Sequence, residues 1–163
     1  MDEIEIRHKG LYDFESIYKA VRKWLKDKEY EFNEPKYKDK AGKDGNEVEI
    51  KMLGELRVTN FVKFTVKTEA KFFGVREFET EFEGETRKMN KGQFYFLIKG
   101  EVEYDYENRF KSDISKYFLN LLIGTILKNY YDVKYVDRFY YELYDLHTLI
   151  KTKTHMETAS NAY

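Results

Sequence analysis

The chain lacks cysteine altogether and contains a single proline among its 163 residues. Without cysteine it has no disulfide bond, no catalytic thiolate and no cysteine-ligated metal site. Pro35 has no N–H for a ladder hydrogen bond, so a strand that contains it is expected at the edge of a sheet. A chain of this length buries a core without staples. We therefore expect one domain over residues 1–163, ordered over about residues 2–155, with a tail at residues 156–163.

Neither sign of charge predominates, because 29 lysines and arginines stand against 30 aspartates and glutamates, leaving a net charge of −1. A surface that follows a nucleic-acid backbone needs a clear positive excess. The densest basic stretch, residues 36–43, contains Asp39 and lies beside Glu34 and Asp44. We therefore do not expect a nucleic-acid partner. Dense, balanced charge with one proline and no cysteine is compatible with a thermophilic source.

Long hydrophobic runs are also missing. The most apolar stretch, residues 117–127, is interrupted by Asn120, Gly124 and Thr125. It is shorter than the roughly 20 apolar residues that span a bilayer. The first five residues are acidic and alternating, unlike a basic leader followed by an apolar run. From these features we expect a cytoplasmic protein without a membrane partner.

Motifs that would carry catalysis or bind a metal are absent from the sequence. His8, His147 and His155 are not spaced as a pair of metal ligands, and no HExxH or CxxC pattern occurs. No GxSxG, Walker-type or GxGxxG sequence is present. Ser112 and Ser115 stand where a helix cap would use them. We therefore expect no catalytic residue, no metal site and no cofactor, and hence a protein that is not an enzyme.

What the sequence does contain is alternation. Between residues 47 and 58, apolar residues recur at every second position and charged residues fill most positions between them. This pattern indicates a strand with one dry face and one solvated face. It predicts about six strands, at Ile4–His8, Tyr30–Tyr37, Glu47–Thr59, Phe61–Phe73, Glu77–Glu83 and Gln93–Tyr106. The short breaks between the later strands favour antiparallel hairpins, with turns at Gly74 and at residues 90–92.

The side chains of these strands separate into a charged set and an aromatic set. A turn after the fourth strand would place the glutamates of residues 77–83 opposite Lys67 and Lys71, as an ordinary solvated sheet surface. The aromatic residues predicted to face the core are Phe64, Phe72, Phe78, Phe82, Phe94 and Phe96. Strands of about twelve residues span on the order of 40 Å and must coil, which predicts a concave sheet. Gly54 and Gly100 fall at inward positions and predict a bend or a close approach.

Three segments repeat apolar residues every three or four positions, which predicts amphipathic helices. The first follows Asp13 as its N-cap, and the others cover about Ser112–Tyr130 and Asp132–Lys153. The predicted buried stripes are Phe14, Ile17, Tyr18, Val21, Trp24 and Leu25 in the first helix, Ile114, Tyr117, Phe118, Leu121, Leu122 and Ile126 in the second, and Val136, Phe139, Tyr140, Leu143, Leu146 and Ile150 in the third. The order β-α-β-β-β-β-β-α-α predicts an α+β fold, with helices packed on one face of a long, curved antiparallel β-sheet.

Aromatic residues make up 18 % of the chain, and several fall outside the predicted core stripes. Five tyrosines gather near the joint between the last two helices and on the reverse side of the last helix: Tyr130, Tyr131, Tyr135, Tyr141 and Tyr144. Tyrosine is enriched in interface cores because it buries a large area at a low entropic cost. We therefore take these five as a candidate interface. The alternative is that loops cover them.

Short stretches distributed along the chain carry a family resemblance. They are Gly10-Leu11-Tyr12-Asp13-Phe14, Trp24-Leu25, Tyr37-Lys38-Asp39-Lys40, Met89-Asn90-Lys91-Gly92, the run from Ile98 to Tyr106, and Tyr144-Asp145-Leu146-His147. Together they resemble a family of small uncharacterised archaeal proteins over most of the chain. The resemblance implies an archaeal and cytoplasmic origin. It brings no known activity and transfers no functional residue.

Two functions remain open at this point. The first is a non-enzymatic binding module that acts through a protein partner or through self-association, using surplus surface aromatics. The second is a carrier of a small apolar ligand, held in a helix-grip-like cavity between a coiled sheet and a long helix. A closed apolar pocket of a few hundred Å3 would favour the carrier. An exposed apolar patch above about 400 Å2 would favour the interaction module.

Overall fold

The computed structural model describes residues 3–43, 45–82 and 85–154, and at positions 78, 80–82 and 85–87 it describes the backbone only. The predicted tail, residues 156–163, and His155 lie outside the described residues. So do the side chains of Phe78 and Phe82, which were expected in the core.

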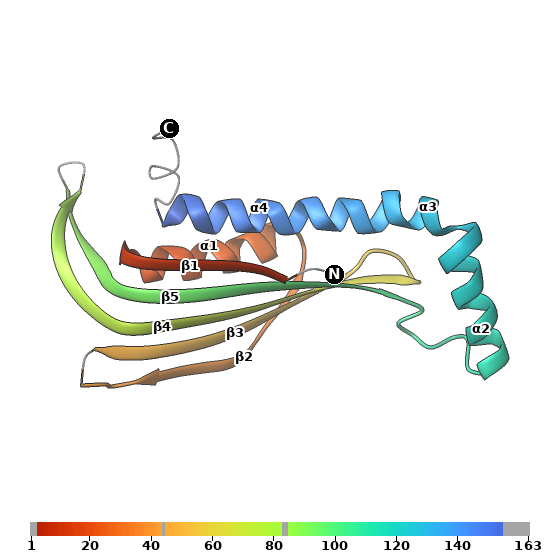
Figure 1. Cartoon of the computed structure of the whole chain (residues 1–163), viewed down its shortest axis with the longest axis horizontal. Helices are drawn as coiled ribbons and strands as arrows, with labels where there is room; N and C mark the ends of the chain where they lie inside the picture. The colour runs from red at the N-terminus through yellow and green to blue at the C-terminus, as the bar shows by residue number, and fades with distance from the viewer. Residues whose placement is uncertain (1–2, 44, 83–84, 155–163) are drawn as a thin grey trace.

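The fold is α+β, built on one antiparallel sheet of five strands in the order β1-β5-β4-β3-β2 (Figure 1). The strands are β1 (Glu3–Tyr12), β2 (Glu31–Lys40), β3 (Asn46–Arg57), β4 (Val62–Phe82) and β5 (Glu85–Tyr104). β2 is an edge strand, and its pairing with β3 shifts between Asn33 and Lys36, around Pro35. This agrees with the position expected for a strand that contains proline.

The prediction of a hairpin at Gly74 is wrong, and the strand count is therefore five and not six. Gly74 has a left-handed φ of 62° and lies where the β4–β5 register shifts, between Phe73 and Arg76. It forms a bulge, which bends a strand without reversing it. Beyond Gly74, β4 and β5 stay paired and curl toward the side of the sheet that carries the helices (Figure 1).

The same continuity overturns two further expectations. Glu77 lies opposite Asn90 and Glu79 opposite Lys88, so neither glutamate faces Lys67 or Lys71 across a hairpin. Residues 90–92 form no turn, because they continue β5 and pair with the end of β1. Glycine and asparagine mark bulges as well as turns, and only the strand pairing distinguishes the two.

Two helices, α1 (Phe14–Asp27) and α4 (Arg138–Lys153), cover the concave face of the sheet (Figure 1). Asp13 caps α1, because its side chain accepts a hydrogen bond of 2.9 Å from the Ser16 N–H. The core between helices and sheet includes Ile17, Val21, Leu25, Phe64, Phe72, Phe94, Phe96, Phe139, Leu143, Leu146 and Ile150. These predicted core positions are confirmed, whereas Tyr140 of the predicted α4 stripe lies at the surface.

Close packing of helix on sheet explains the two inward glycines. A Cβ atom at Gly54 would lie 2.6 Å from Leu25 Cδ2, and one at Gly100 would lie 2.8 Å from Phe139 Cε1. Real Cβ atoms do not approach other heavy atoms so closely. Glycine at these positions therefore allows α1 and α4 to approach the strands, as the sequence predicted.

The last helices are divided differently from the prediction. α2 (Asp113–Leu121) continues into the π-helical segment η1 (Leu122–Ile126), and the chain bends at Leu127, whose φ and ψ are −100° and 4°. α3 (Lys128–Tyr131), η2 (Asp132–Asp137) and α4 then follow one another in line along the sheet (Figure 1). The boundary thus falls near Leu127 and not between residues 130 and 132. We call α2 and η1, residues 113–126, the arm, and residues 128–153 the long helix.

Candidate interaction surface

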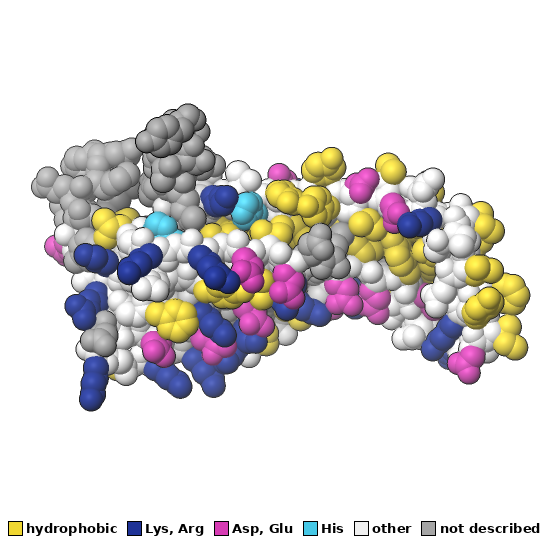
Figure 2. Space-filling model, viewed as in Figure 1, with side chains coloured by type: hydrophobic (Ala, Val, Ile, Leu, Met, Phe, Trp, Pro, Cys, Tyr) yellow, Lys and Arg dark blue, Asp and Glu magenta, His cyan; other side chains and the backbone are white. Residues whose placement is uncertain are grey.

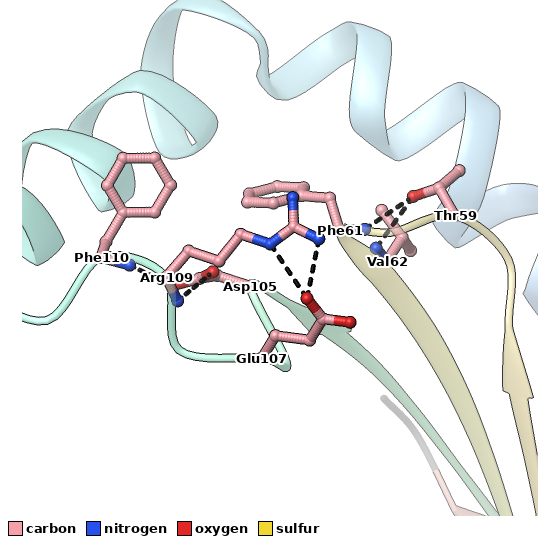
Figure 3. Close-up of polar contacts among 7 residues, drawn as sticks. All are labelled: Thr59, Phe61, Val62, Asp105, Glu107, Arg109 and Phe110. Atoms are coloured by element: carbon pink, nitrogen blue, oxygen red, sulfur yellow. Dashed lines mark hydrogen bonds and ion pairs between the residues drawn. The ribbon is translucent and has the colours of Figure 1, made fainter.

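The arm leaves the end of the sheet through a loop that Asp105 holds in place. The buried Asp105 carboxylate accepts hydrogen bonds from the backbone N–H groups of Arg109, at 2.9 Å, and Phe110, at 3.1 Å (Figure 3). The Asp105 N–H donates to the Phe61 carbonyl at 2.8 Å. Asp105 has a φ of 53°, a left-handed conformation that aspartate tolerates better than most residues. The loop therefore fixes where the arm begins.

Neighbouring contacts stabilise the same end of the sheet. Thr59 Oγ1 accepts hydrogen bonds from the N–H groups of Phe61 and Val62, at 3.1 and 3.0 Å (Figure 3). The Arg109 guanidinium binds the Glu107 carboxylate at 2.7 Å, which also raises the pKa of Arg109. Together with the bond from the Asp105 N–H to the Phe61 carbonyl, these contacts order both the β3–β4 turn and the loop that precedes the arm.

The arm itself begins as its sequence predicts. Ser112 is the N-cap, and its Oγ accepts a hydrogen bond of 3.1 Å from the Ser115 N–H. Asp113 lies in the first turn, where a negative charge stabilises the N-terminal end of the helix dipole. The arm is therefore a properly started helix and not an irregular extension of the loop.

One face of the arm lies toward the rest of the molecule. Ser115, Leu119, Ile123 and Leu127 recur every four residues and are the half-buried positions of this region. Ile123 and Gly124 line an open groove of about 320 Å3 together with Val102 and Tyr104 at the end of the sheet. Ile123 is thus the half-buried position of the arm that lies across a groove from the end of the sheet.

The outer face of the arm is apolar and exposed. Six large side chains lie on it, between 41 % and 74 % exposed: Ile114, Tyr117, Phe118, Leu121, Leu122 and Ile126. Figure 2 shows hydrophobic side chains gathered at the end of the molecule that the arm forms. The prediction that these residues are buried is wrong. Their periodicity is helical as expected, but the arm lies past the end of the sheet, so no described strand covers it.

The five tyrosines predicted as an interface separate into two groups. Tyr130, Tyr141 and Tyr144 are exposed on the long helix. Tyr135 is buried in the core, and Tyr131 is half-buried, with its ring centroid 5.2 Å from that of Tyr104 and 5.5 Å from that of Tyr135. The structure therefore brings three of the five to the surface and packs the other two inward, and no loop covers the first three among the described residues.

The exposed tyrosines make polar contacts along the long helix. The Lys134 ammonium donates to the Tyr130 hydroxyl at 2.6 Å and lies 4.9 Å from the centroid of the same ring. The Tyr140 and Tyr144 hydroxyls are hydrogen-bonded at 2.8 Å. Sequence reasoning missed Tyr140 and Val133 as surface residues, because it placed Tyr140 in the core stripe and did not consider Val133.

A buried polar contact joins the long helix to the start of β2. The Tyr30 hydroxyl donates to Glu142 Oε2 at 3.1 Å, and Arg138 Nε donates to Glu142 Oε1 at 3.3 Å. Burial, and next the neighbouring Glu142 charge, raises the pKa of the Tyr30 phenol well above its ordinary value. This arrangement satisfies a buried carboxylate and positions α4, which is a structural role.

The described residues contain no group of three or more histidine, aspartate or glutamate side chains placed to hold a metal ion. Among the helices formed by those residues, none combines the length and the apolar character needed to cross a membrane. Side chains fill the space between the long helix and the sheet, where the Phe64 and Phe139 rings stack with centroids 4.5 Å apart. The candidate site is therefore a surface, the outer face of the arm.

Comparison of the chain with protein-family models gives no match, and no curated protein matches it.

Proposed function

We propose that this chain is a non-enzymatic interaction module that associates with a protein, whether another protein or a copy of itself, through the outer face of the arm. This proposal rests on the exposure of six large apolar side chains on the arm, which among the described helices is the one that leaves the sheet. Contiguous apolar patches above a few hundred Å2 are rare on monomeric soluble proteins, and they mark interaction sites.

The way the arm is held supports the same conclusion. Asp105 fixes the preceding loop through two backbone hydrogen bonds, and Ser112 caps the helix. A surface that is already ordered before it binds loses less conformational entropy when a partner covers it. The apolar face is thus presented to solvent on an anchored helix.

The filled interior favours an interaction module over the carrier of a small apolar ligand. The concave face of the sheet packs directly on α1 and α4, and Gly54 and Gly100 remove the side chains that would hold the layers apart. A carrier site buries most of its ligand within an apolar cavity. The grooves of about 660 Å3 along α1 and of about 320 Å3 beside the arm are open at the surface.

Native mass spectrometry of the protein, purified gently from the host that produces it, tests the proposal. We expect the wild-type chain to appear in a protein complex or as an oligomer, and the double variant Ile114→Ser, Phe118→Ser to appear as a free monomer. Both residues are exposed, so the variant should retain the wild-type circular dichroism spectrum. The matched control is Tyr141→Ser, Tyr144→Ser, which removes exposed aromatic area from the long helix and should preserve the association.

Two results would contradict the proposal. A wild-type monomer that retains a small-molecule mass would favour the carrier. Association that is lost in the tyrosine variant and preserved in the arm variant would transfer the contact surface from the arm to the long helix.

A further inference from the structure

We infer that the partner of the arm is a second copy of this chain, and that two arms pair antiparallel about a two-fold axis near residue 120. The inference rests on the proposed function and names its partner. A two-fold interface uses the same patch on both copies, so it requires a face that is complementary to itself.

The apolar face has the area that such an interface needs. Taking about 200 Å2 for a large apolar side chain, the exposed fractions of the six residues leave about 700 Å2 of apolar surface on each copy. Stable protein interfaces bury about 800 Å2 on each partner. Complete cover of this surface by a second arm would therefore supply most of a standard interface.

The register follows from the extent of the apolar face. It runs from Ile114 to Ile126, so its midpoint is residue 120. Two antiparallel arms overlap most completely when these midpoints coincide. Ile114 of one copy then lies opposite Ile126 of the other, and Phe118 lies opposite Leu122.

The arm carries few charges, and its helix dipole favours the antiparallel arrangement. Asp113 begins the arm, whereas Lys128 lies beyond the bend at Leu127 and lines the same groove as Ile123. Antiparallel pairing opposes the dipoles of the two arms, whereas parallel pairing would align them. Between Ser112 and Leu127 the arm carries only Asp113 and Lys116 as charged residues. These two charges cancel, so the arm lacks the positive excess that binding to a polyanion needs, and a second copy of the arm is the better partner.

Sedimentation velocity of the purified chain alone gives the first test. We expect a concentration-dependent monomer–dimer equilibrium, and a loss of dimer affinity of about 30-fold or more in Phe118→Lys, as for a central interface residue. The exposed Tyr141→Lys is the matched control and should leave the equilibrium unchanged. Interfaces of this area have micromolar or better affinity, so a wild-type monomer up to about 100 μM would overturn the inference.

Cross-linking tests the antiparallel register. The chain has no cysteine, so an introduced cysteine is the only thiol. A short bismaleimide should link Leu121→Cys to itself, because the two positions are offset by about 3 Å along the axes. Ile114→Cys should link to Ile126→Cys and not to itself, since its own offset is about 18 Å. Self-linking at position 114 would overturn the register.

The two proposals fail in different ways. In one outcome, the arm variants abolish association with another protein while the purified wild-type chain stays monomeric. That result would overturn the second copy as the partner, and it would support the interaction module. If arm variants change neither the native complex nor the sedimentation of the purified chain, both proposals are overturned.

Discussion

The rings of Phe64 and Phe139 stack with their centroids 4.5 Å apart and 26° between their planes. Phe64 lies in the middle of the sheet and Phe139 at the start of α4, and both are fully buried. This pair joins the two layers of the fold, one ring from the central strand β4 and one from α4.

Phe64→Ala should therefore lower the free energy of unfolding by about 3–5 kcal/mol, because it removes buried ring area and leaves a cavity. Urea denaturation followed by circular dichroism measures the change. Phe73→Ala is the control, since Phe73 is nearly half-exposed on the same strand, and its cost should stay below about 1 kcal/mol. Equal costs for the two variants would contradict the assigned strand register.

Gly100→Ala should destabilise the fold by about 1–3 kcal/mol, because its Cβ would overlap Phe139 and force α4 away from β5. Gly124 offers a matched control on the arm, where a Cβ would meet no heavy atom within 4 Å. Gly124→Ala should be neutral or stabilising by up to about 1 kcal/mol, since alanine favours a helix more than glycine does. Thermal unfolding of both variants compares them, and a neutral Gly100→Ala would show that α4 packs less closely than described.

Tyr12→Phe should leave stability at pH 7 unchanged or slightly higher, because the buried Tyr12 hydroxyl has no hydrogen-bond partner among the described residues. Burial raises the pKa of Tyr12 to about 12. Above pH 10 the unfolded chain loses the Tyr12 proton while the folded chain retains it, so stability falls as the pH rises from about 10 to about 12.

The alkaline loss of stability should be smaller in Tyr12→Phe than in the wild type. Urea midpoints measured at intervals from pH 8 to pH 12 compare the two proteins. Tyr141→Phe removes an exposed phenol and should reproduce the wild-type profile. A Tyr12→Phe profile identical to that of the wild type would mean that the Tyr12 ring is solvated in the folded protein.

Asp105→Ala should cost about 1–3 kcal/mol, because it leaves the Arg109 and Phe110 N–H groups without their acceptor. Alanine also tolerates the left-handed φ of position 105 less well than aspartate does. Amide hydrogen exchange should accelerate most at residues 109 and 110. Asp105→Asn retains one side-chain oxygen acceptor, and the two N–H groups bond to different carboxylate oxygens, so it should preserve protection at one of residues 109 and 110 and lose it at the other. Loss of protection spread evenly over the sheet would contradict this local role.

Much of the fold could be predicted because it follows from local patterns. The alternation from Val48 to Leu56 identified β3 and its buried face, since a strand turns successive side chains to opposite sides. Asp13 and Ser112 identified helix starts, because a cap bonds to an N–H only three residues away. Each of these signals depends on neighbours along the chain.

The position of the candidate site could not be predicted in the same way. The apolar repeat of Ile114, Phe118 and Leu121 is the same whether a sheet covers the helix or water does. Among the exposed tyrosines, Tyr141 was predicted and Tyr140 was not, because a rotation of the helix by a fraction of a turn decides which ring is covered. Burial is a relation between elements distant in the sequence.

The sequence by itself determined the α+β class and the antiparallel strands, because both follow from the period at which apolar side chains recur. It also determined the helix caps and the two inward glycines, because these depend on the side chain, or the missing Cβ, at a single position. Only the tertiary structure decided that Gly74 bends a strand without ending it, and that the chain turns back along the sheet at Leu127, after the arm. A left-handed glycine suits a bulge and a turn equally well, and strand pairing selects between them. The bend at Leu127 leaves the arm beyond the last strand, which is why its apolar face is exposed.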